Sequence, residues 1–463
     1  MKEVPQNVVL ISTYELGHQP FGLASPAAWL KAAGATVQCQ DLSVQRLNPE
    51  VIADADLIAF YLPMHTATKL AVAAVPQIKA INPTAHLCFY GLYAPMNEKF
   101  LRKLGANTVL GGEFEKELVT VYEGLRTPAA ASAPPLAQQQ PLISLTRQKF
   151  IVPDRSGLRT LSNYAYLNAP DGSRQIAGYT EASRGCKHLC RHCPIVPIYQ
   201  GTFRVVQHEV VLQDIQKQVE HGARHITFGD PDFFNGIGHA IPLVTELHER
   251  YPELTYDVTI KIEHLLQHQQ YLPVLRDTGC LFVTSAVEAV EDRILEIFDK
   301  HHTREDFLQV VAQCRRVGLT LLPTFVAFNP WITLEGYLDL LTVLDALELV
   351  EYVPPIQLAI RLLIPAGSRL LELSSVQGLI QEFDETALCY PWRHPDPRVD
   401  QLQANVLALV TQGERRKESR STIFDAVWKV AHEAAGVRDP QEGRPRVRSS
   451  LIAVPHMSEA WFC

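Results

Sequence analysis

The chain has 463 residues, of which 47% are hydrophobic and 20% charged, and its formal net charge at pH 7 is -8. This length allows two or three domains, and the composition is ordinary for a globular protein with a sizeable core. The negative charge argues against nucleic acid as the main partner, because phosphate binders concentrate lysine and arginine.

The nine cysteines are sparse for this length, which is typical of a reduced cytoplasmic protein rather than of a secreted disulfide scaffold. The N-terminal sequence MKEVPQNVVLIST lacks the basic and apolar regions of a signal peptide. No apolar run is long enough to span a bilayer. We therefore expect a soluble, cytoplasmic protein. Six cysteines stand singly: Cys39, Cys88, Cys280, Cys314, Cys389 and Cys463.

Residues 1–126 alternate short apolar runs with helix-like segments, which predicts a doubly wound parallel sheet of the Rossmann-like α/β class. A turn-rich loop precedes the first expected helix, at 27–34. The expected strands are 7–13, 36–42, 55–63, 86–91 and 107–112. Ligands of such sheets bind beyond the carboxyl ends of the strands. This rule indicates the loops 12–26, 63–66, 91–97 and 111–115.

Residues 127–141 are rich in Pro, Ala and Gln and are a linker by composition. Residues 142–375 are assigned to a partial or full (β/α) barrel: 142–178 look irregular, and repeated strand and helix patterns follow the cysteine motif. Its expected strands are a first one around Gly178 to Ala182 and runs at 223–230, 255–262, 280–288, 319–328 and 356–365. Residues 376–463 are expected to form a mainly helical extension and tail, with a helical run at 399–436.

The most specific pattern is EASRGCKHLCRHCP, which places Cys186, Cys190 and Cys193 at C-x-x-x-C-x-x-C spacing. Three nearby thiols can converge on one metal or cluster, but structural zinc usually takes a fourth protein ligand. A [4Fe–4S] cluster on three cysteines keeps one iron open. Three alternatives remain from the residues alone: a zinc site completed by His188 or His192, a disulfide with a spare thiol, and cysteines buried by chance.

This segment and the sequence downstream, to about residue 375, resemble the radical SAM superfamily. The resemblance implies that the three cysteines hold a [4Fe–4S] cluster whose open iron is chelated by S-adenosylmethionine, which is then cleaved reductively to a 5′-deoxyadenosyl radical. It also implies that Asp230 and Asp232, in FGDPDFF after the second barrel strand, lie at the amino group of the cofactor. The alternative for these two carboxylates is a solvated turn that caps the next helix.

The later strands supply further candidates. By the same resemblance, Ser285 and Glu288 would lie near the ribose and carboxylate of the cofactor, and Lys261 would face the site or end a solvated strand. Asn329 or Trp331, in PTFVAFNPW, would reach the barrel mouth near the adenine. Arg361 interrupts an apolar run, and because a buried charge is rarely unpaired, it either pairs with a carboxylate in the barrel or contacts substrate.

The turn of Gly111, Gly112 and Glu113, in LGGEFE, resembles the Gly-Gly-Glu turn of cobalamin-binding domains, which commonly precede radical SAM barrels. Glycines let the backbone approach a bulky ligand closely. The Asp-x-His-x-x-Gly motif that supplies an axial histidine in many such domains is absent, and His18 lies in the different pattern GHQPFG. We expect cobalamin to be bound without a histidine ligand; the alternative is that the domain keeps the fold without the cofactor.

The sequence stops at SEAWFC, and this end resembles that of radical SAM proteins with a CUAEP or CCAEP tail. In that group a cysteine is followed by selenocysteine or a second cysteine. The hypothesis is a selenoprotein truncated after Cys463, with the pair acting as a soft ligand or redox centre. The alternative is an ordinary terminus that happens to end in cysteine.

These patterns predict a radical SAM enzyme that transfers a methyl group to a small molecule with the help of cobalamin. Its electron donor would be a flavodoxin or ferredoxin, and neither nucleic acid nor membrane is an expected partner. Two alternatives remain. One is transfer of the aminocarboxypropyl group to a soft acceptor without cobalamin, and the other is a non-enzymatic zinc-binding protein.

Overall fold

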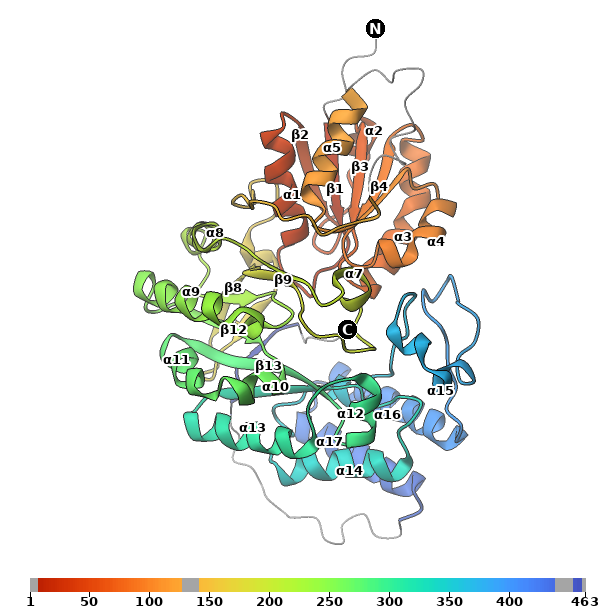
Figure 1. Ribbon diagram of the computed structural model, residues 1–463. Helices are drawn as coiled ribbons and strands as arrows, with labels where there is room; N and C mark the ends of the chain where they lie inside the picture. The colour runs from red at the N-terminus through yellow and green to blue at the C-terminus, as the bar shows by residue number, and fades with distance from the viewer. Residues whose placement is uncertain (1–6, 127–140, 438–452, 460–463) are drawn as a thin grey trace.

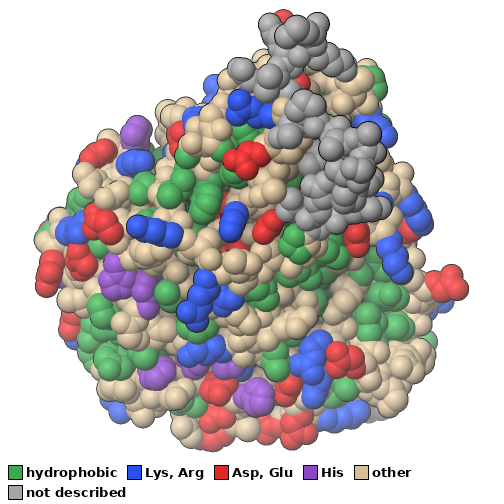
Figure 2. Space-filling view, turned by 45° about the horizontal axis from the view of Figure 1, so that its top comes forward, with side chains coloured by type: hydrophobic (Ala, Val, Ile, Leu, Met, Phe, Trp, Pro, Cys, Tyr) green, Lys and Arg blue, Asp and Glu red, His purple; other side chains and the backbone are tan. Residues whose placement is uncertain are grey.

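The computed structural model describes residues 7–126, 141–437 and 453–459. Two helix-flanked sheets lie one above the other, with the N-terminal sheet in red and orange at the top of Figure 1 and the second sheet in green below it. None of the helices in the described ranges has the length and apolar character that a membrane span needs. On the face drawn in Figure 2, acidic and basic side chains are interspersed.

The N-terminal sheet is parallel throughout and has the strand order β2-β1-β3-β4-β5-β6, which confirms the predicted doubly wound α/β class. Alternate residues of β1 enter opposite cores, as expected for a sheet covered by helices on both faces. The strands are β1 Asn7–Ser12, β2 Thr36–Asp41, β3 Leu57–Tyr61, β4 His86–Tyr90, β5 Thr108–Gly112 and β6 Ile143–Ser144. The helices are α1 Phe21–Ala32, α2 Pro49–Ala53, α3 His65–Ile81, α4 Glu98–Lys103 and α5 Glu115–Arg126.

Helix α1 begins at Phe21, inside the loop that the sequence predicted. Pro26 lies within the helix and has no N–H to donate to the carbonyl of Gly22. The hydroxyl of Tyr90, on β4, donates to that carbonyl at 2.8 Å. Tyr90 therefore replaces the hydrogen bond that Pro26 cannot donate within α1.

The two glycines at the end of β5 make room for other parts of the protein. A Cβ on Gly111 would lie 2.2 Å from Cγ of Pro95. Gly112 has φ +75°, and a Cβ there would lie 2.2 Å from the carbonyl oxygen of Ser144 on β6. The close approach that the sequence assigned to a ligand is thus occupied by Pro95 and by the first strand after the linker.

We expect Gly112→Ala to destabilise the protein by about 1–3 kcal/mol more than Gly172→Ala. Both glycines have positive φ, +75° and +82°, so the backbone strain of alanine is similar at the two positions. Only Gly112 has an atom in the path of the new Cβ, since nothing lies within 4 Å at Gly172. Urea unfolding measures the difference, and equal losses would contradict the crowding at β6.

The second sheet has the order β14-β13-β12-β11-β8-β7-β15, in which β8 and β11 to β14 are parallel and β7 and β15 pair antiparallel at one edge. It curls into a half-barrel, which confirms the predicted partial (β/α) barrel. Its strands are β7 Tyr166–Asn168, β8 Arg174–Thr180, β11 His225–Phe228, β12 Thr255–Thr259, β13 Cys280–Glu288, β14 Thr320–Phe325 and β15 His456–Met457. A separate hairpin consists of β9 Ser183–Gly185 and β10 Phe203–Val205.

Helices of the barrel follow the strands, and the helical C-terminal extension, in blue, lies at the lower right of Figure 1. The barrel helices are α7 Val196–Tyr199, α8 His208–Glu220, α9 Ile237–Arg250, α10 Ile262–Gln267, α11 Leu272–Asp277, α12 Asp292–Phe298, α13 Arg304–Val317 and α14 Leu334–Ala346. The extension has α15 Ser374–Gln377, α16 Pro397–Arg415 and α17 Arg420–Ala434. The predicted helical run at 399–436 is therefore two helices.

The predicted strand at 356–365 is wrong. Residues Pro355–Leu358 form a 3₁₀ turn, and the segment makes one isolated bridge, between Arg361 and Phe328. Prolines before the turn lack the N–H groups that a strand needs for its ladder. Arg361 pairs with Asp400 of α16 at 2.7 Å and stacks on Trp392 at 3.5 Å. Its carboxylate partner therefore comes from the C-terminal extension.

Candidate active site

The cysteine loop leaves the β9 hairpin at the carboxyl end of β8, where half-barrel sites are found. Cys190 is 7% exposed, and none of the three thiols forms a disulfide. Burial, with Asp232 and Cys190 nearby, raises the pKa of Cys186 to about 11. Burial and the neighbouring thiols also raise the pKa of Cys193. Both Cys186 and Cys193 thus lie close enough to another thiol of the motif for it to oppose their ionisation.

Glu288 ends β13 and faces the cysteine loop. Its carboxylate lies 3.1 Å from Nε2 of His192, inside the loop, and 3.4 Å from Nζ of Lys300. Burial acts to raise the pKa of Glu288, but Lys300 and His192 lower it to about 2. Burial acts to lower the pKa of Lys300, but Glu288, Cys190 and Cys193 raise it. Lys300, which follows helix α12, therefore places a buried ammonium that stays charged beside the thiols.

Glu288 also has φ +73°, in the left-handed region that side chains rarely adopt. Its carbonyl accepts from the N–H of Val326, the residue after β14. Strained backbone of this kind persists only where its surroundings fix it, and it clusters at functional sites. The strand end is therefore held in a fixed geometry at the barrel mouth.

Asp230 is directed at the protein rather than at open space. Its carboxylate accepts from the N–H of Ala182 at 2.8 Å and from the hydroxyl of Ser183 at 2.5 Å, and it is 3% exposed. Burial raises the pKa of Asp230 from its ordinary value to about 7, although both hydrogen bonds lower it. The structure gives this residue the role of fixing the strand that leads into the cysteine loop.

Asp230→Asn should make the stability of the folded protein less dependent on pH. The folded protein holds the Asp230 proton up to about pH 7, whereas the unfolded chain loses it near pH 4. The wild type therefore loses stability from this group as pH rises between those values. The stability of the variant relative to the wild type should rise over the same interval and then level off. Urea unfolding of both proteins at pH 5 and pH 8 measures this. An equal difference in the free energy of unfolding at the two pH values would contradict it.

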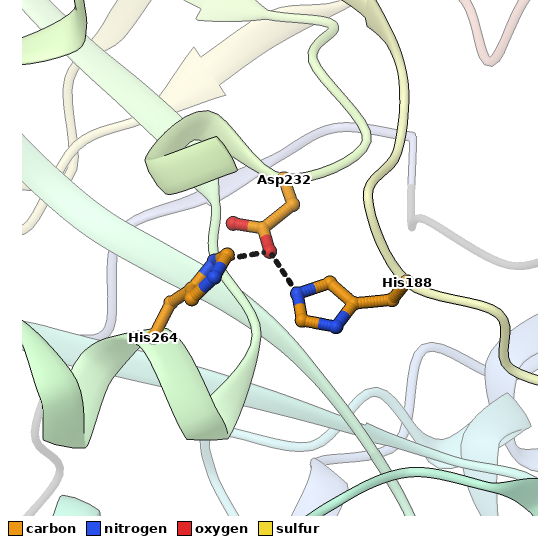
Figure 3. A group of neighbouring side chains, drawn as sticks. All are labelled: His188, Asp232 and His264. Carbon is orange, nitrogen blue, oxygen red and sulfur yellow. Dashed lines mark ion pairs between the residues drawn. The ribbon is translucent and has the colours of Figure 1, made fainter. Parts of the chain in front are cut away.

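Asp232 lies at the other side of the same turn. One oxygen accepts from the N–H of Phe234, and the other lies 2.7 Å from Nδ1 of His264 and 3.7 Å from Nε2 of His188. Figure 3 shows the two imidazoles approaching this oxygen from different elements. Lys261 lies behind His188, with Nζ 3.1 Å from Nδ1 of that ring. Lys261 is thus 7% exposed inside the site and is not a solvated strand end.

Ser285 and Asn329 differ in whether their polar side-chain atoms have hydrogen-bond partners. Ser285 is fully buried on β13, and its hydroxyl has no hydrogen-bond partner within the described residues. Asn329 is also fully buried, but its amide accepts from the N–H of Trp331 and donates to the carbonyl of Val326. Ser285 therefore has an unused polar group, whereas Asn329 closes its own turn.

Glu113 belongs to an ion network that joins the two sheets. The guanidinium of Arg184, on β9, contacts Glu115 at 2.7 Å, Glu181 at 2.6 Å and Glu113 at 3.4 Å. The hydroxyl of Tyr199 also donates to Glu113, at 3.3 Å. Burial raises the pKa of Glu113 to about 7, although Arg184 lowers it. The glutamate of the Gly-Gly-Glu turn is thus held by the cysteine-loop hairpin.

The sequence did not single out Arg184, His264 or Lys300. His264 lies in α10, the helix that follows β12, so its place near the carboxyl end of a barrel strand was a usable signal. Arg184 stands two residues before the first cysteine of the motif, but its partners are distant in sequence. Cys463 lies outside the described residues, so its predicted role stays a prediction.

A family model described as the Radical SAM superfamily matches residues 180–332, so this part of the chain is a radical SAM domain. A bacteriochlorophyllide d C-8(2)-methyltransferase of Chlorobaculum tepidum is 24% identical over 197 residues, which cover 40% of each chain. A tRNA-2-methylthio-N(6)-dimethylallyladenosine synthase of Phocaeicola vulgatus is 26% identical over 31% of this chain and 33% of its own. The chain thus spans less than half the length of these curated relatives.

Two solved structures share the fold over most of the chain. The radical S-adenosylmethionine methyltransferase TsrM from Kitasatospora setae, with tryptophan and a SAM analogue bound, has a TM-score of 0.65 and 16% identity over 88% of this chain and 89% of its own. The cobalamin-dependent enzyme OxsB, with aqua-cobalamin and S-adenosylmethionine bound, has a TM-score of 0.64 and 14% identity over 89% and 67%. The fold likeness covers both sheets.

Proposed function

We propose that the protein is a cobalamin-dependent radical SAM enzyme that transfers a methyl group to a small molecule. The observation that carries the proposal is the position of three free thiols at the carboxyl end of a half-barrel inside a radical SAM domain. The N-terminal sheet above this site supports the cobalamin assignment, since the same two-sheet fold occurs in TsrM and OxsB. An electron donor such as flavodoxin or ferredoxin is part of the proposal.

The cysteine loop fits a [4Fe–4S] cluster. Burial and mutual proximity raise the pKa of Cys186 and Cys193, so as free thiols they resist ionisation. A bound metal reverses this, because it supplies the positive charge that keeps thiolates stable. Lys300 adds a buried ammonium beside Cys190 and Cys193. Three cysteine ligands leave one iron open for the amino and carboxylate groups of adenosylmethionine.

When bound, the cluster supplies one electron to adenosylmethionine, and cobalamin carries the methyl group. The protein's part is to hold and orient these groups and to exclude water. Ser285 offers the unpartnered hydroxyl for the ribose, and Glu288, fixed by Lys300 and His192, supplies a carboxylate that stays ionised over the physiological range. Lys261, buried at the mouth, supplies a positive charge for a carboxylate.

The fit to cobalamin rests on the polar carboxyl edge of the N-terminal sheet. Ser12 at the end of β1, Glu15 in the loop after it and Asn97 after β4 each have a buried side-chain oxygen without a hydrogen-bond partner in the described chain. Such unused groups suit a ligand with many amide side chains. His18 would not be available to a bound cobalamin, because it is buried with its ring 4.8 Å from that of Tyr179.

One observation favours a second candidate, transfer of the aminocarboxypropyl group without cobalamin. The Gly-Gly-Glu turn does not face open space, because Pro95, Ser144 and Arg184 occupy its surroundings. A cobalamin site that depended on this turn would not form. The two candidates differ in cofactor content and in the nucleoside that they release.

Anaerobic purification with cobalamin supplied during expression, followed by reaction with dithionite and methyl-labelled adenosylmethionine, tests the proposal. We expect about four irons and one cobalamin per chain, with labelled methyl appearing in a small-molecule product. Release of methylthioadenosine by protein free of cobalamin would support the second candidate instead. A colourless protein with one zinc and no iron would contradict both.

A further inference from the structure

Three donor atoms converge beside the cysteine loop on a point that no hydrogen bond explains. They are Nε2 of His188, Oδ2 of Asp232 and Nδ1 of His264, and all lie within 4.8 Å of one another. Each of the three is buried and has no hydrogen-bond partner among the described residues. Figure 3 shows that the side chains come from the loop, the turn after β11 and helix α10, and that they point at one another.

The contact between Asp232 and His264 is short but is not a hydrogen bond. The two atoms lie 2.7 Å apart, yet neither atom satisfies hydrogen-bond geometry. Asp232 is 2% exposed on its side chain, and the side chains of His264 and His188 are 7% and 12% exposed. Buried polar atoms that lack a hydrogen-bond partner destabilise the folded protein. A cation between the three atoms would satisfy all of them at once.

The spacing suits a transition metal. Imidazole nitrogen and carboxylate oxygen bind zinc at about 2.0–2.2 Å, which requires ligand atoms roughly 3–3.5 Å apart. The observed separations of 2.7 Å and 3.7 Å from Asp232 lie on either side of that range. Calcium and magnesium are disfavoured, because they prefer oxygen ligands to imidazole.

A carboxylate also lies near the outer nitrogen of His188. Its second nitrogen, Nδ1, lies 3.6 Å from the carboxylate of Glu263, and that carboxylate accepts from Lys261 at 2.9 Å. A ligating histidine usually donates its other N–H to a carboxylate, which fixes the ring and the tautomer. In the structure this nitrogen instead accepts a hydrogen bond from Nζ of Lys261 at 3.1 Å, so a metal on Nε2 requires Nδ1 to gain the proton and Lys261 to turn toward Glu263 alone.

We propose that His188, Asp232 and His264 form a mononuclear site for a divalent first-row transition metal, separate from the cysteine ligands. Two imidazoles and one carboxylate are a ligand set of catalytic zinc and of non-haem iron(II). Three protein ligands leave a position open for water or for a donor atom of the substrate. Since His188 lies between Cys186 and Cys190 in the chain, the second metal sits next to the cluster loop.

The test is zinc binding by the full-length, cluster-reconstituted protein. Protein stripped with a chelator is given zinc, desalted and measured for zinc and iron by mass spectrometry. The wild type should retain one zinc per chain, and X-ray absorption should show nitrogen and oxygen donors near 2.0 Å without sulfur at about 2.3 Å. Asp232→Asn, which preserves shape, and His264→Ala should weaken zinc binding by roughly 100-fold or more.

His268→Ala is the matched control. This histidine follows α10, with its ring 5.8 Å from that of His264, but it is not one of the three converging side chains. The control should retain zinc, and all variants should keep the iron content of the wild type. Sulfur in the first shell of zinc, no zinc in the wild type, or equal zinc in all variants would each overturn the proposal. These outcomes are independent of iron content and of cofactor cleavage.

Discussion

Replacing Arg184 with methionine is expected to destabilise the protein by about 3–5 kcal/mol, because it leaves buried carboxylates without their cation. Arg184 contacts Glu113, Glu115 and Glu181, and the four side chains are between 0% and 13% exposed. Methionine keeps much of the apolar volume of the arginine stem, so the loss reports mainly the missing charge. Urea unfolding of the full chain measures it.

The loss of stability in Arg184→Met should be smaller at low pH than at high pH. The pKa of Glu113 is already raised to about 7, and without the guanidinium it rises further. At pH 5 this carboxyl is protonated and no longer needs a cation, so the variant should lose less stability at pH 5 than at pH 8.

Arg250→Met is the control for Arg184→Met. Arg250 also contacts two glutamates, Glu209 and Glu246, but these pairs lie on the surface. Surface ion pairs contribute about 0–1 kcal/mol, so this variant should change little. A loss at Arg184 no larger than that at Arg250 would contradict the account of the network.

Alanine at Cys186, Cys190 or Cys193 should remove the cluster. Each variant loses one of only three protein ligands, so we expect iron to fall well below about four per chain. Release of nucleoside from adenosylmethionine should fall roughly 100-fold or more, since the step that depends on the cluster is lost. Iron analysis, absorbance near 400 nm and product chromatography measure these effects.

Cys389→Ala is the matched control, because Cys389 is also a free, partly exposed cysteine but lies in the C-terminal extension. It should keep wild-type iron and activity. An intact cluster in any one of the three alanine variants would contradict the ligand assignment.

Much of the architecture could be predicted because it depends on local patterns. Alternating apolar runs identified β1 to β5 of the N-terminal sheet, and the cysteine spacing identified the loop at the barrel mouth. They did not identify β6, Ile143–Ser144, which pairs with β5 although its residues were assigned to the barrel. Two further elements differed from the prediction, and in both a proline is involved. Pro26 suggested a loop, yet Tyr90 supplies the donor that lets α1 continue through it. The run at 356–365 looked like a strand, although prolines at its start prevent a ladder.

The details of the site were less predictable, because they depend on which residues meet across the fold. Asp230 and Asp232 are two residues apart, yet one binds the backbone of Ala182 and the other faces two histidines. The glycines of the Gly-Gly-Glu turn indicate a close approach, but sequence does not say that β6 and Pro95 make it. Glu113 and Arg184 are 71 positions apart in the chain.

The central claim is that the iron left open by the three cysteines binds adenosylmethionine. The most direct measurement is the electron paramagnetic resonance spectrum of the dithionite-reduced protein before and after adenosylmethionine is added. The account predicts a [4Fe–4S]⁺ signal whose g values shift when the cofactor is added. A cluster signal that adenosylmethionine leaves unchanged would contradict it.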